Sequence, residues 1–318
     1  RRTSRASAAL HWMQRSPDKP MQDPDPPAQP SAPAWRCGRF TYGMERALVM
    51  GILNLTPDSF SDGGRHLRPA DAIAAAHAMI DDGVDILDLG AESTRPGATP
   101  TSEGEELDRL LPVLEALRGA PVALSVDTRH PAVMRAAIGA GADMINDIEA
   151  LATPEAVAAV AGTDCGVCLM HMRGSPLTMQ QAPAYREVVG EVASFLQARL
   201  DRAMAGGIAA ERIVLDPGIG FGKDLGHNLS LLHSLDRLVA LGRPVLVGVS
   251  RKSMIGALTG RPVGERLAGS LAAALAAAGR GARVLRVHDV RETVDALRVW
   301  NAIEAGSPAQ GEERRPGP

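Results

Sequence analysis

Short apolar runs recur along the chain, and most of them end on polar residues. The eight runs are Leu48–Leu53, Val84–Leu89, Val122–Val126, Asp143–Ile148, Gly166–Met170, Ile213–Leu215, Val245–Val249 and Val284–Val287. Such runs are too uniformly apolar for a sheet with one face in water. They therefore predict strands that are buried on both faces, as in parallel sheets.

A helix-like segment follows each run. The apolar positions recur at helical spacing after the first run, at Ile73, His77 and Ile80, and after the second at Leu107, Leu110, Leu111, Leu114 and Leu117. Helix starts are predicted where Ser102 precedes Glu105, Thr153 precedes Pro154, and Asp289 precedes Glu292.

Eight strand-plus-helix units in about 260 residues predict an α/β fold of the (β/α)8 TIM barrel class. An open doubly wound sheet is the alternative, but no GxGxxG follows the first strand.

The two ends of the chain differ in composition from this repeating part. Arg and Ser dominate up to Ser16, and seven of the seventeen residues from Pro17 to Pro33 are proline. We expect a disordered extension over residues 1–40, a single barrel domain over 46–305 and a flexible tail over 306–318. The Arg- and Ser-rich start superficially resembles a transit peptide. The alternative is an upstream remnant, with the working start at Met44.

Composition narrows the class of protein. The chain has 318 residues, of which 45% are hydrophobic, and a formal net charge of -3, which does not suit a strongly basic nucleic-acid binder. No apolar run approaches the ~20 residues that span a bilayer. The three cysteines, Cys37, Cys165 and Cys168, predict a reducing, cytoplasmic location. We interpret the CxxC pair as small buried hydrophobes and not as a redox or zinc motif.

Polar side chains stand where the predicted strands end. They are Asn54, Asp88, Asp127, Asn146, Asp147, His171, Asp216, Ser250, Arg286 and His288. Because the carboxyl ends of barrel strands form one edge, which carries the active sites of such barrels, we expect these groups to converge on one cavity. A long polar loop containing Phe60 follows Asn54, as is typical of a ligand-facing segment.

The charges at this edge are sorted. Arg251, Lys252, Arg286 and His288 follow the last two strands and suit a phosphate or diphosphate. Asp127, Asn146 and Asp216 offer acceptors and an amide that suit a flat, donor-rich heterocycle. Asn54 and Asp62 are candidate oxygen ligands for Mg2+, which binds through one or two protein oxygens plus substrate phosphates. A Schiff-base role for Lys252 is an alternative, but neighbouring Arg251 favours a binding cation.

Eight sequence motifs carry a family resemblance over about residues 46–305. They are GILNLTPDSFSDGG from Gly51, ESTRPG from Glu92, SVDT from Ser125, INDI from Ile145, LMHM from Leu169, LDPGIGFGK from Leu215, GVSRKS from Gly248 and RVHD from Arg286. The chain resembles the dihydropteroate synthase family of pterin-binding barrels. The resemblance implies a Mg2+-assisted transferase that condenses 6-hydroxymethyl-7,8-dihydropterin diphosphate with 4-aminobenzoate, giving 7,8-dihydropteroate and diphosphate in folate biosynthesis.

The resemblance also implies residue roles. The pterin would contact Asp127, Asn146, Asp216 and Lys252, with Met170 and Phe221 nearby. The diphosphate would contact Thr94, Arg95, Arg286 and His288, and Asn54 and Asp62 through Mg2+. The 4-aminobenzoate, and the sulfonamides that mimic it, would lie against Phe60, Pro96, Ser250 and Lys252. Asp127, Asp216, Lys252, Arg286 and His288 would form the catalytic group, for a dissociative substitution that needs no covalent nucleophile.

Two other functions share this socket. A corrinoid-linked pterin methyltransferase barrel would have less use for the first loop and for the cations, and a catalytically silent pterin-binding homologue should have lost some of the site residues. The expected homodimer rests on the family's habit and on an Ala- and Gly-rich helix at 264–279. Ala91 and Glu149 depart from the family pattern.

Overall fold

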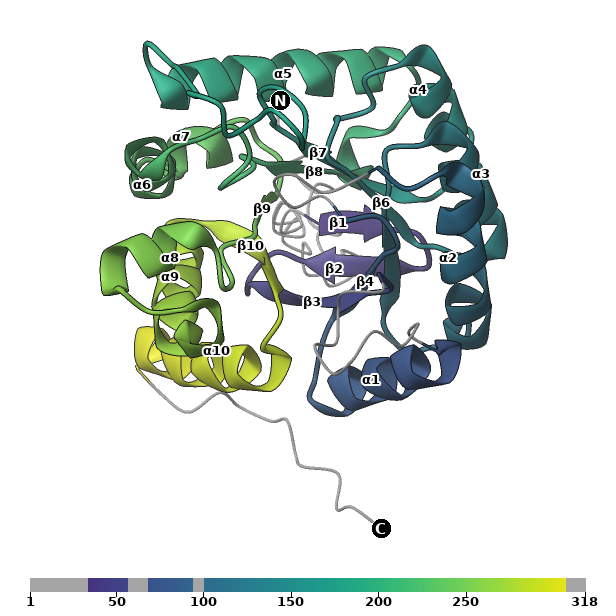
Figure 1. The fold of residues 1–318 in the computed structure, drawn as a ribbon, viewed down its shortest axis with the longest axis horizontal. Helices are drawn as coiled ribbons and strands as arrows, with labels where there is room; N and C mark the ends of the chain where they lie inside the picture. Colours follow the sequence, from purple (N-terminus) through teal and green to yellow (C-terminus); the bar gives the residue numbers. More distant parts are fainter. Residues whose placement is uncertain (1–33, 57–67, 94–99, 307–318) are drawn as a thin grey trace, which may run out of the picture. The chain divides into compact units, whose positions relative to one another are not determined.

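The computed structural model describes residues 34–56, 68–93 and 100–306. Eight parallel strands close into a barrel in the order β10-β3-β4-β5-β6-β7-β8-β9 (Figure 1). The strands are β3 (Leu48–Asn54), β4 (Ile86–Gly90), β5 (Ala123–Asp127), β6 (Met144–Asp147), β7 (Gly166–Met170), β8 (Ile213–Asp216), β9 (Val245–Val247) and β10 (Ala282–Val287). The predicted TIM barrel is confirmed, and the open sheet is excluded.

Helices surround the barrel (Figure 1). They are α1 (Pro69–Asp81), α2 (Glu103–Leu117), α3 (Pro131–Ala140), α4 (Pro154–Ala161), α5 (Val188–Ala205), α6 (Leu225–His233), α7 (Asp236–Val239), α8 (Ser253–Thr259), α9 (Leu267–Gly279) and α10 (Val290–Ala305), with 3-10 turns η1 (Ala210–Arg212) and η2 (Val263–Glu265). The buried leucines of α2 pack toward the strands in a core shared by the whole ring. None of the helices in the described ranges is long and apolar enough to cross a membrane.

Two of the three predicted helix caps are confirmed. The Ser102 hydroxyl accepts from the Glu105 N–H at 3.3 Å, and the Thr153 hydroxyl accepts from the Ala156 N–H at 3.2 Å. The third prediction is wrong, because the Asp289 side chain caps no N–H of α10. Its carboxylate instead accepts from the Nε of Arg251 at 3.1 Å, in a pair in which donor and acceptor are both charged, whereas a cap would charge the acceptor alone.

The inward-facing positions of the strands change character along the barrel axis. Near the amino ends they are apolar and form one buried cluster that includes Ile86, Met144, Val214 and Val284. Because alternate residues of a strand face the same side, the residues two positions later also point inward. Those residues are Asp88, Asn146, Asp216 and Arg286. The barrel thus has an apolar floor and a polar upper layer, which opens at the carboxyl-end edge that we call the rim.

A β-hairpin packs against the apolar floor and corrects one predicted boundary. Strands β1 (Ala34–Cys37) and β2 (Phe40–Gly43) pair antiparallel, so the expectation of disorder is wrong for residues 34–40, while residues 1–33 lie outside the described ranges. Trp35 and Cys37 are fully buried in the floor cluster. The hairpin is also tied to strand starts, for example by the Tyr42 hydroxyl, which donates to the Asp85 carbonyl at 2.9 Å. A chain that began at Met44 would lack this element.

The three cysteines are free and buried, which confirms their interpretation as small hydrophobes. Burial raises the pKa of the Cys165 thiol to about 12, so this side chain stays protonated.

Candidate functional site

Arg286 joins two carboxylates at the centre of the rim. Its Nε donates to Asp88 at 2.6 Å, and its Nη2 donates to Asp127 at 2.8 Å. Asp88 also accepts from the Asn146 amide at 3.2 Å and from the Ser125 hydroxyl at 2.7 Å. Four strands, β4, β5, β6 and β10, therefore contribute to one hydrogen-bonded network on the inner face of the barrel.

Burial shapes the ionisation of this network. Desolvation raises the pKa of Asp127 to about 7, although the Arg286 guanidinium opposes the rise. Burial alone would lower the pKa of Arg286, but the charges of Asp88 and Asp127 outweigh it and raise that pKa. Asp127 therefore titrates near neutral pH beside a permanent cation.

Lys252 lies near Asp216 and Phe221. Its Nζ is 4.9 Å from the centre of the Phe221 ring and donates to the Ile219 carbonyl. Burial lowers the pKa of Lys252 to about 8, with Asp216 opposing the shift. Burial raises the pKa of Asp216, which Lys252 opposes; Asp216 also accepts from the Gly218 N–H at 2.6 Å. A carboxylate, a cation and an aromatic face are thus presented together.

The cations after the last two strands have different partners. His288 bonds to Ser250, with its backbone N–H at 3.2 Å and its Nδ1 at 3.1 Å from the hydroxyl. Arg251, which the sequence analysis placed with the phosphate-binding cations, pairs instead with Asp289, and its side chain is 43% exposed. Its assignment to the phosphate-binding cations stays a prediction.

Asn54 and Met170 end their strands beside the network. Asn54 is half-buried at the end of β3 and pairs in register with Gly90, the last residue of β4. Met170 is buried at the end of β7 and pairs in register with Asp216. Among the described residues, no group of three or more His, Cys, Asp or Glu is placed to hold a metal ion.

Comparison with known proteins identifies the family. A family model described as pterin binding enzyme matches residues 50–288. A dihydropteroate synthase of Neisseria meningitidis serogroup B is 51% identical over 276 residues, which is 85% of this chain and 97% of that protein. The chain belongs to the dihydropteroate synthase family.

Solved structures of dihydropteroate synthases agree with this assignment. The enzyme of Xanthomonas albilineans with 4-aminobenzoic acid is 51% identical, with a TM-score of 0.81, covering 86% of this chain and 99% of that one. The enzyme of Yersinia pestis in a sulfonamide drug complex is 46% identical, with a TM-score of 0.82, covering 86% and 100%.

The structure brings together most of the residues that the dihydropteroate synthase resemblance implied. Asp127, Asn146 and Arg286 share one network, Asp216, Phe221 and Lys252 lie around the loop after β8, and Ser250 pairs with His288. Phe60, Asp62, Thr94, Arg95 and Pro96 lie outside the described residues.

Three residues of this dihydropteroate synthase site received no role from the sequence. Asp88 is fully buried and bonded to Arg286, while Lys223 and His171 form a buried pair, with Lys223 Nζ 2.9 Å from His171 Nδ1. A signal was present for Asp88, because a carboxylate inside an otherwise apolar strand needs a buried partner. Lys223 gave no such signal, since a lysine after a glycine-rich turn usually faces solvent.

Glu92 ties the two flanks of the segment that follows β4. Its carboxylate accepts from the Thr101 N–H at 3.2 Å and from the Arg129 Nε at 3.1 Å. Arg129 in turn reaches Glu149 at 3.4 Å, so the unusual Glu149 belongs to the same charge cluster.

Proposed function

We propose that the rim binds 6-hydroxymethyl-7,8-dihydropterin diphosphate and 4-aminobenzoate and joins them into 7,8-dihydropteroate, releasing diphosphate. As a member of the dihydropteroate synthase family the chain is a transferase of folate biosynthesis. The observation that supports the assignment of roles is the network of Arg286 with Asp88 and Asp127, in which acceptors and a fixed cation meet on the inner face of the barrel.

The pterin ring would lie in the polar layer of the barrel. Its N–H groups require acceptors, which Asp127 and Asp216 supply, and its ring acceptors require donors such as the Asn146 amide and Lys252. The Phe221 ring and Met170 would contact its faces. Because all of these side chains are buried or half-buried, their bonds to the ring compete little with water.

The diphosphate would lie on the side of Arg286 and His288, together with Thr94 and Arg95. Mg2+ fits this arrangement, because the single neutral oxygen of Asn54, with Asp62, suits an ion that takes most of its ligands from phosphate and water. When bound, Mg2+ neutralises charge on the diphosphate. A bidentate Arg286 would then hold the phosphoryl oxygens through the same donors that now meet the two aspartates.

The 4-aminobenzoate would lie against Ser250, Lys252, Phe60 and Pro96, and sulfonamides would compete for the same place. The bond from the exocyclic methylene carbon to the diphosphate oxygen breaks, and its electron pair leaves with the diphosphate. The amine nitrogen of 4-aminobenzoate then bonds to that carbon and releases a proton to water. The side chains bind and orient both substrates and stabilise charge, and none forms a covalent intermediate.

The test is an assay of diphosphate release. The chain is supplied with the dihydropterin diphosphate and Mg2+, with and without 4-aminobenzoate, and 7,8-dihydropteroate is followed by chromatography. We expect release that depends on the aromatic amine and that a sulfonamide inhibits competitively. Release without amine, or methyl transfer to a corrinoid in its place, would reject the proposal.

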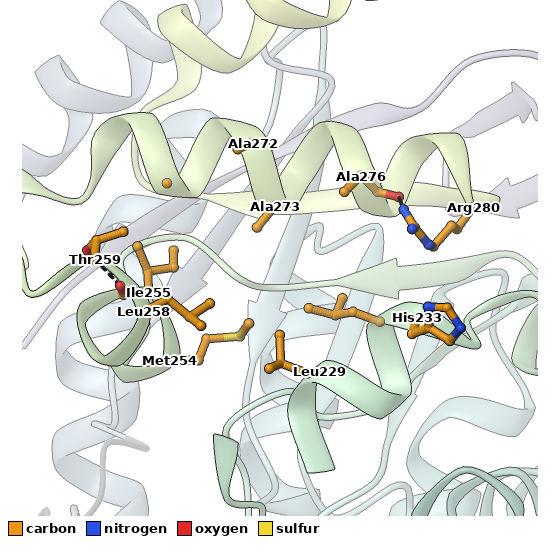
Figure 2. A pocket seen from close by; sticks show the side chains of 12 residues that line it. Leu229, His233, Met254, Ile255, Leu258, Thr259, Ala272, Ala273, Ala276 and Arg280 are labelled. Carbon is orange, nitrogen blue, oxygen red and sulfur yellow. Dashed lines mark hydrogen bonds between the residues drawn. The ribbon is translucent and has the colours of Figure 1, made fainter. Parts of the chain in front are cut away.

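We also propose that the chain forms a homodimer through an apolar groove on the outside of the barrel. The groove has a volume of about 550 Å³ and is lined by side chains of α6, α8 and α9 (Figure 2). Figure 2 shows Ala272, Ala273 and Ala276 of α9 facing Met254 and Leu258 of α8. Leu258 is 57% exposed and Leu229 is 39% exposed, and small residues between such side chains permit close approach of a second copy.

Light scattering after size-exclusion chromatography tests the dimer. Leu258→Glu places a charge in the groove, and we expect it to convert the dimer into a monomer without unfolding it. Val299→Glu, at an exposed position of α10 outside the groove lining, is the matched control and should leave the mass unchanged. A wild-type chain that elutes as a monomer would reject the proposal.

A further inference from the structure

Lys223 is a buried lysine at the end of the loop that contacts Asp216 and Lys252, two residues proposed to bind the pterin. It is 2% exposed, and its Nζ lies 2.9 Å from the carbonyl oxygens of Gly218 and Phe221, 2.9 Å from the His171 Nδ1 and 3.3 Å from the His171 carbonyl. An ammonium has three donors, and three acceptors stand at 2.9 Å. Lys223 therefore bonds to two carbonyls of its own loop and to His171, which lies in the connection between β7 and α5.

The loop from Pro217 to Lys223 packs closely against the backbone of the segment that follows β7. Gly218 has a φ of +65°, and a Cβ there would lie 1.9 Å from the His171 carbonyl oxygen; Gly222 has a φ of +64°, and a Cβ there would lie 2.4 Å from the Arg173 carbonyl oxygen. Only glycine meets both demands. Two side chains from outside the loop also bond to it. The Asn228 Oδ1 accepts from the Gly220 N–H at 2.8 Å, and the Tyr185 hydroxyl donates to the Gly222 carbonyl at 2.9 Å.

This loop contacts three of the residues proposed to hold the pterin. The Gly218 N–H donates to Asp216 at 2.6 Å, the Ile219 carbonyl accepts from Lys252, and the loop carries Phe221. A shift of the loop would therefore displace an acceptor, a donor and a ring face together. Lys223 itself is directed to backbone carbonyls, so it needs no contact with the substrate.

We propose that Lys223 is a positioning residue for dihydropterin binding: its ammonium, seated against His171, fixes the loop so that Asp216, Phe221 and Lys252 share one geometry. This inference rests on the pterin assignment made above. It extends that assignment to a side chain that does not touch the ring.

The charge of Lys223 adds a second effect on the same site. Asp216 faces Lys252, Lys223 and Arg286, and each of these cations lowers its pKa against the effect of burial. Burial lowers the pKa of Lys223 to about 7, with Asp216 opposing the shift and Lys252 and Arg173 adding to it, so the ammonium is present on the acid side of neutrality. His171 stays neutral, because burial and the nearby Lys223 lower its pKa to about 3. Removing the ammonium should therefore raise the pKa of Asp216 as well as release the loop.

The experiment compares Lys223→Met with the wild-type chain in steady-state kinetics with both substrates. We expect KM for the dihydropterin diphosphate to rise about tenfold or more, as a misplaced binding group does, with KM for 4-aminobenzoate within about twofold. The acid limb of the pH profile of kcat/KM should move to higher pH. Wild-type KM values and an unmoved pH profile would overturn the proposal.

Arg212 offers a matched control at the opposite end of β8. It too is a buried cation that binds backbone carbonyls, with its Nε 2.8 Å from Cys165 O and its Nη2 3.0 Å from Val160 O. Arg212→Met should lower the melting temperature but leave both KM values and the pH profile unchanged. Equal changes in KM in the two variants would mean that Lys223 acts only through stability.

Lys223→Gln covers the case in which the methionine variant does not fold. The amide retains a donor for one carbonyl but carries no charge, so we expect a folded chain with the same direction of change in KM and in the acid limb. A glutamine variant that matches the wild type would overturn the proposal. An inactive wild-type chain would instead reject the proposed function, which separates the two failures.

Discussion

The two ends of the barrel handle buried charge differently. At the floor, Asp143 is 2% exposed and accepts from Arg39 Nε at 2.9 Å, Arg39 Nη2 at 2.8 Å and the Leu124 N–H at 3.0 Å. At the rim, the buried Asp88 and Asp127 share Arg286, and the buried Asp216 is influenced by the charge of Lys252; both cations are proposed ligand-binding groups.

This difference separates groups that stabilise the fold from groups that await a substrate. The floor pair is saturated with hydrogen bonds and packs against an apolar cluster. The rim groups have pKa values moved toward neutrality, about 7 for Asp127 and about 8 for Lys252, because burial is incompletely offset. Displaced pKa values of this kind are a property of functional sites. We therefore expect rim substitutions to lower activity more than stability, and floor substitutions to lower stability more than activity.

The largest effect is expected from Arg286→Met. This variant loses the guanidinium that we propose binds the diphosphate, and it leaves Asp88 and Asp127 without their partner, so kcat/KM should fall by about 10³-fold, or ~4 kcal/mol. Diphosphate release measures the loss. Arg39→Met at the floor is the control: it should lower the melting temperature with kcat/KM within about twofold. Comparable activity losses in both variants would break the comparison.

Trp35→Ala tests whether the floor contributes to stability alone and not to substrate binding. The indole is fully buried in the hairpin and donates to the Arg212 carbonyl at 3.3 Å. Its truncation should reduce the free energy of unfolding by roughly 3 kcal/mol, measured by urea denaturation. KM for both substrates should not change, because the hairpin lies at the end of the barrel away from the rim. A raised KM would show that the floor contributes to binding.

The pH dependence of activity and of stability tests the rim group Asp127. Its carboxylate becomes ionised as the pH rises through about 7, so kcat/KM of the wild type should fall below that pH. Asp127→Asn should lose the contribution of Asp127 to this limb, keep that of Asp216, and lower kcat/KM by about tenfold at pH 8. Because the folded pKa is raised, the stability that protonation gives is present below pH 4 and is lost as the pH rises through 7. Thermal unfolding of both chains across that range checks the sign.

The smallest effect is expected from Arg251→Met. The side chain is 43% exposed and pairs with Asp289, so its loss should cost about 0–1 kcal/mol of stability and change KM for the dihydropterin diphosphate by less than about twofold. A large rise in that KM would support the predicted role of Arg251 in binding phosphate.

Much of the barrel could be predicted because its strands are short, apolar and regularly spaced. The predicted run 166–170 matches β7 residue for residue, and the others differ by one or a few residues at their ends. The hairpin was missed because Trp35 and Tyr42 follow a proline-rich segment and have no helical or strand period of their own. Their burial depends on Arg212 and Asp85, which are distant in sequence.

Site residues at the ends of predicted strands could be identified from the sequence. Residues whose partners are set by tertiary contacts could not. Asp127, Asn146 and Arg286 were assigned to the site from position alone, and they do share one network. Asp289 was read as a cap, because sequence spacing cannot show that Arg251 competes for its carboxylate. Lys223 was left without a role, because only the folded loop brings two of its own carbonyls and His171 to its Nζ.

The hairpin at the floor limits the route by which substrates and products can reach the polar layer of the barrel. With Trp35 and Cys37 buried among the inward-facing apolar side chains, the barrel is closed at its base, and molecules reach its polar layer from the rim. Under the proposed assignment, the two substrates would therefore enter, and both products would leave, through the same end of the barrel.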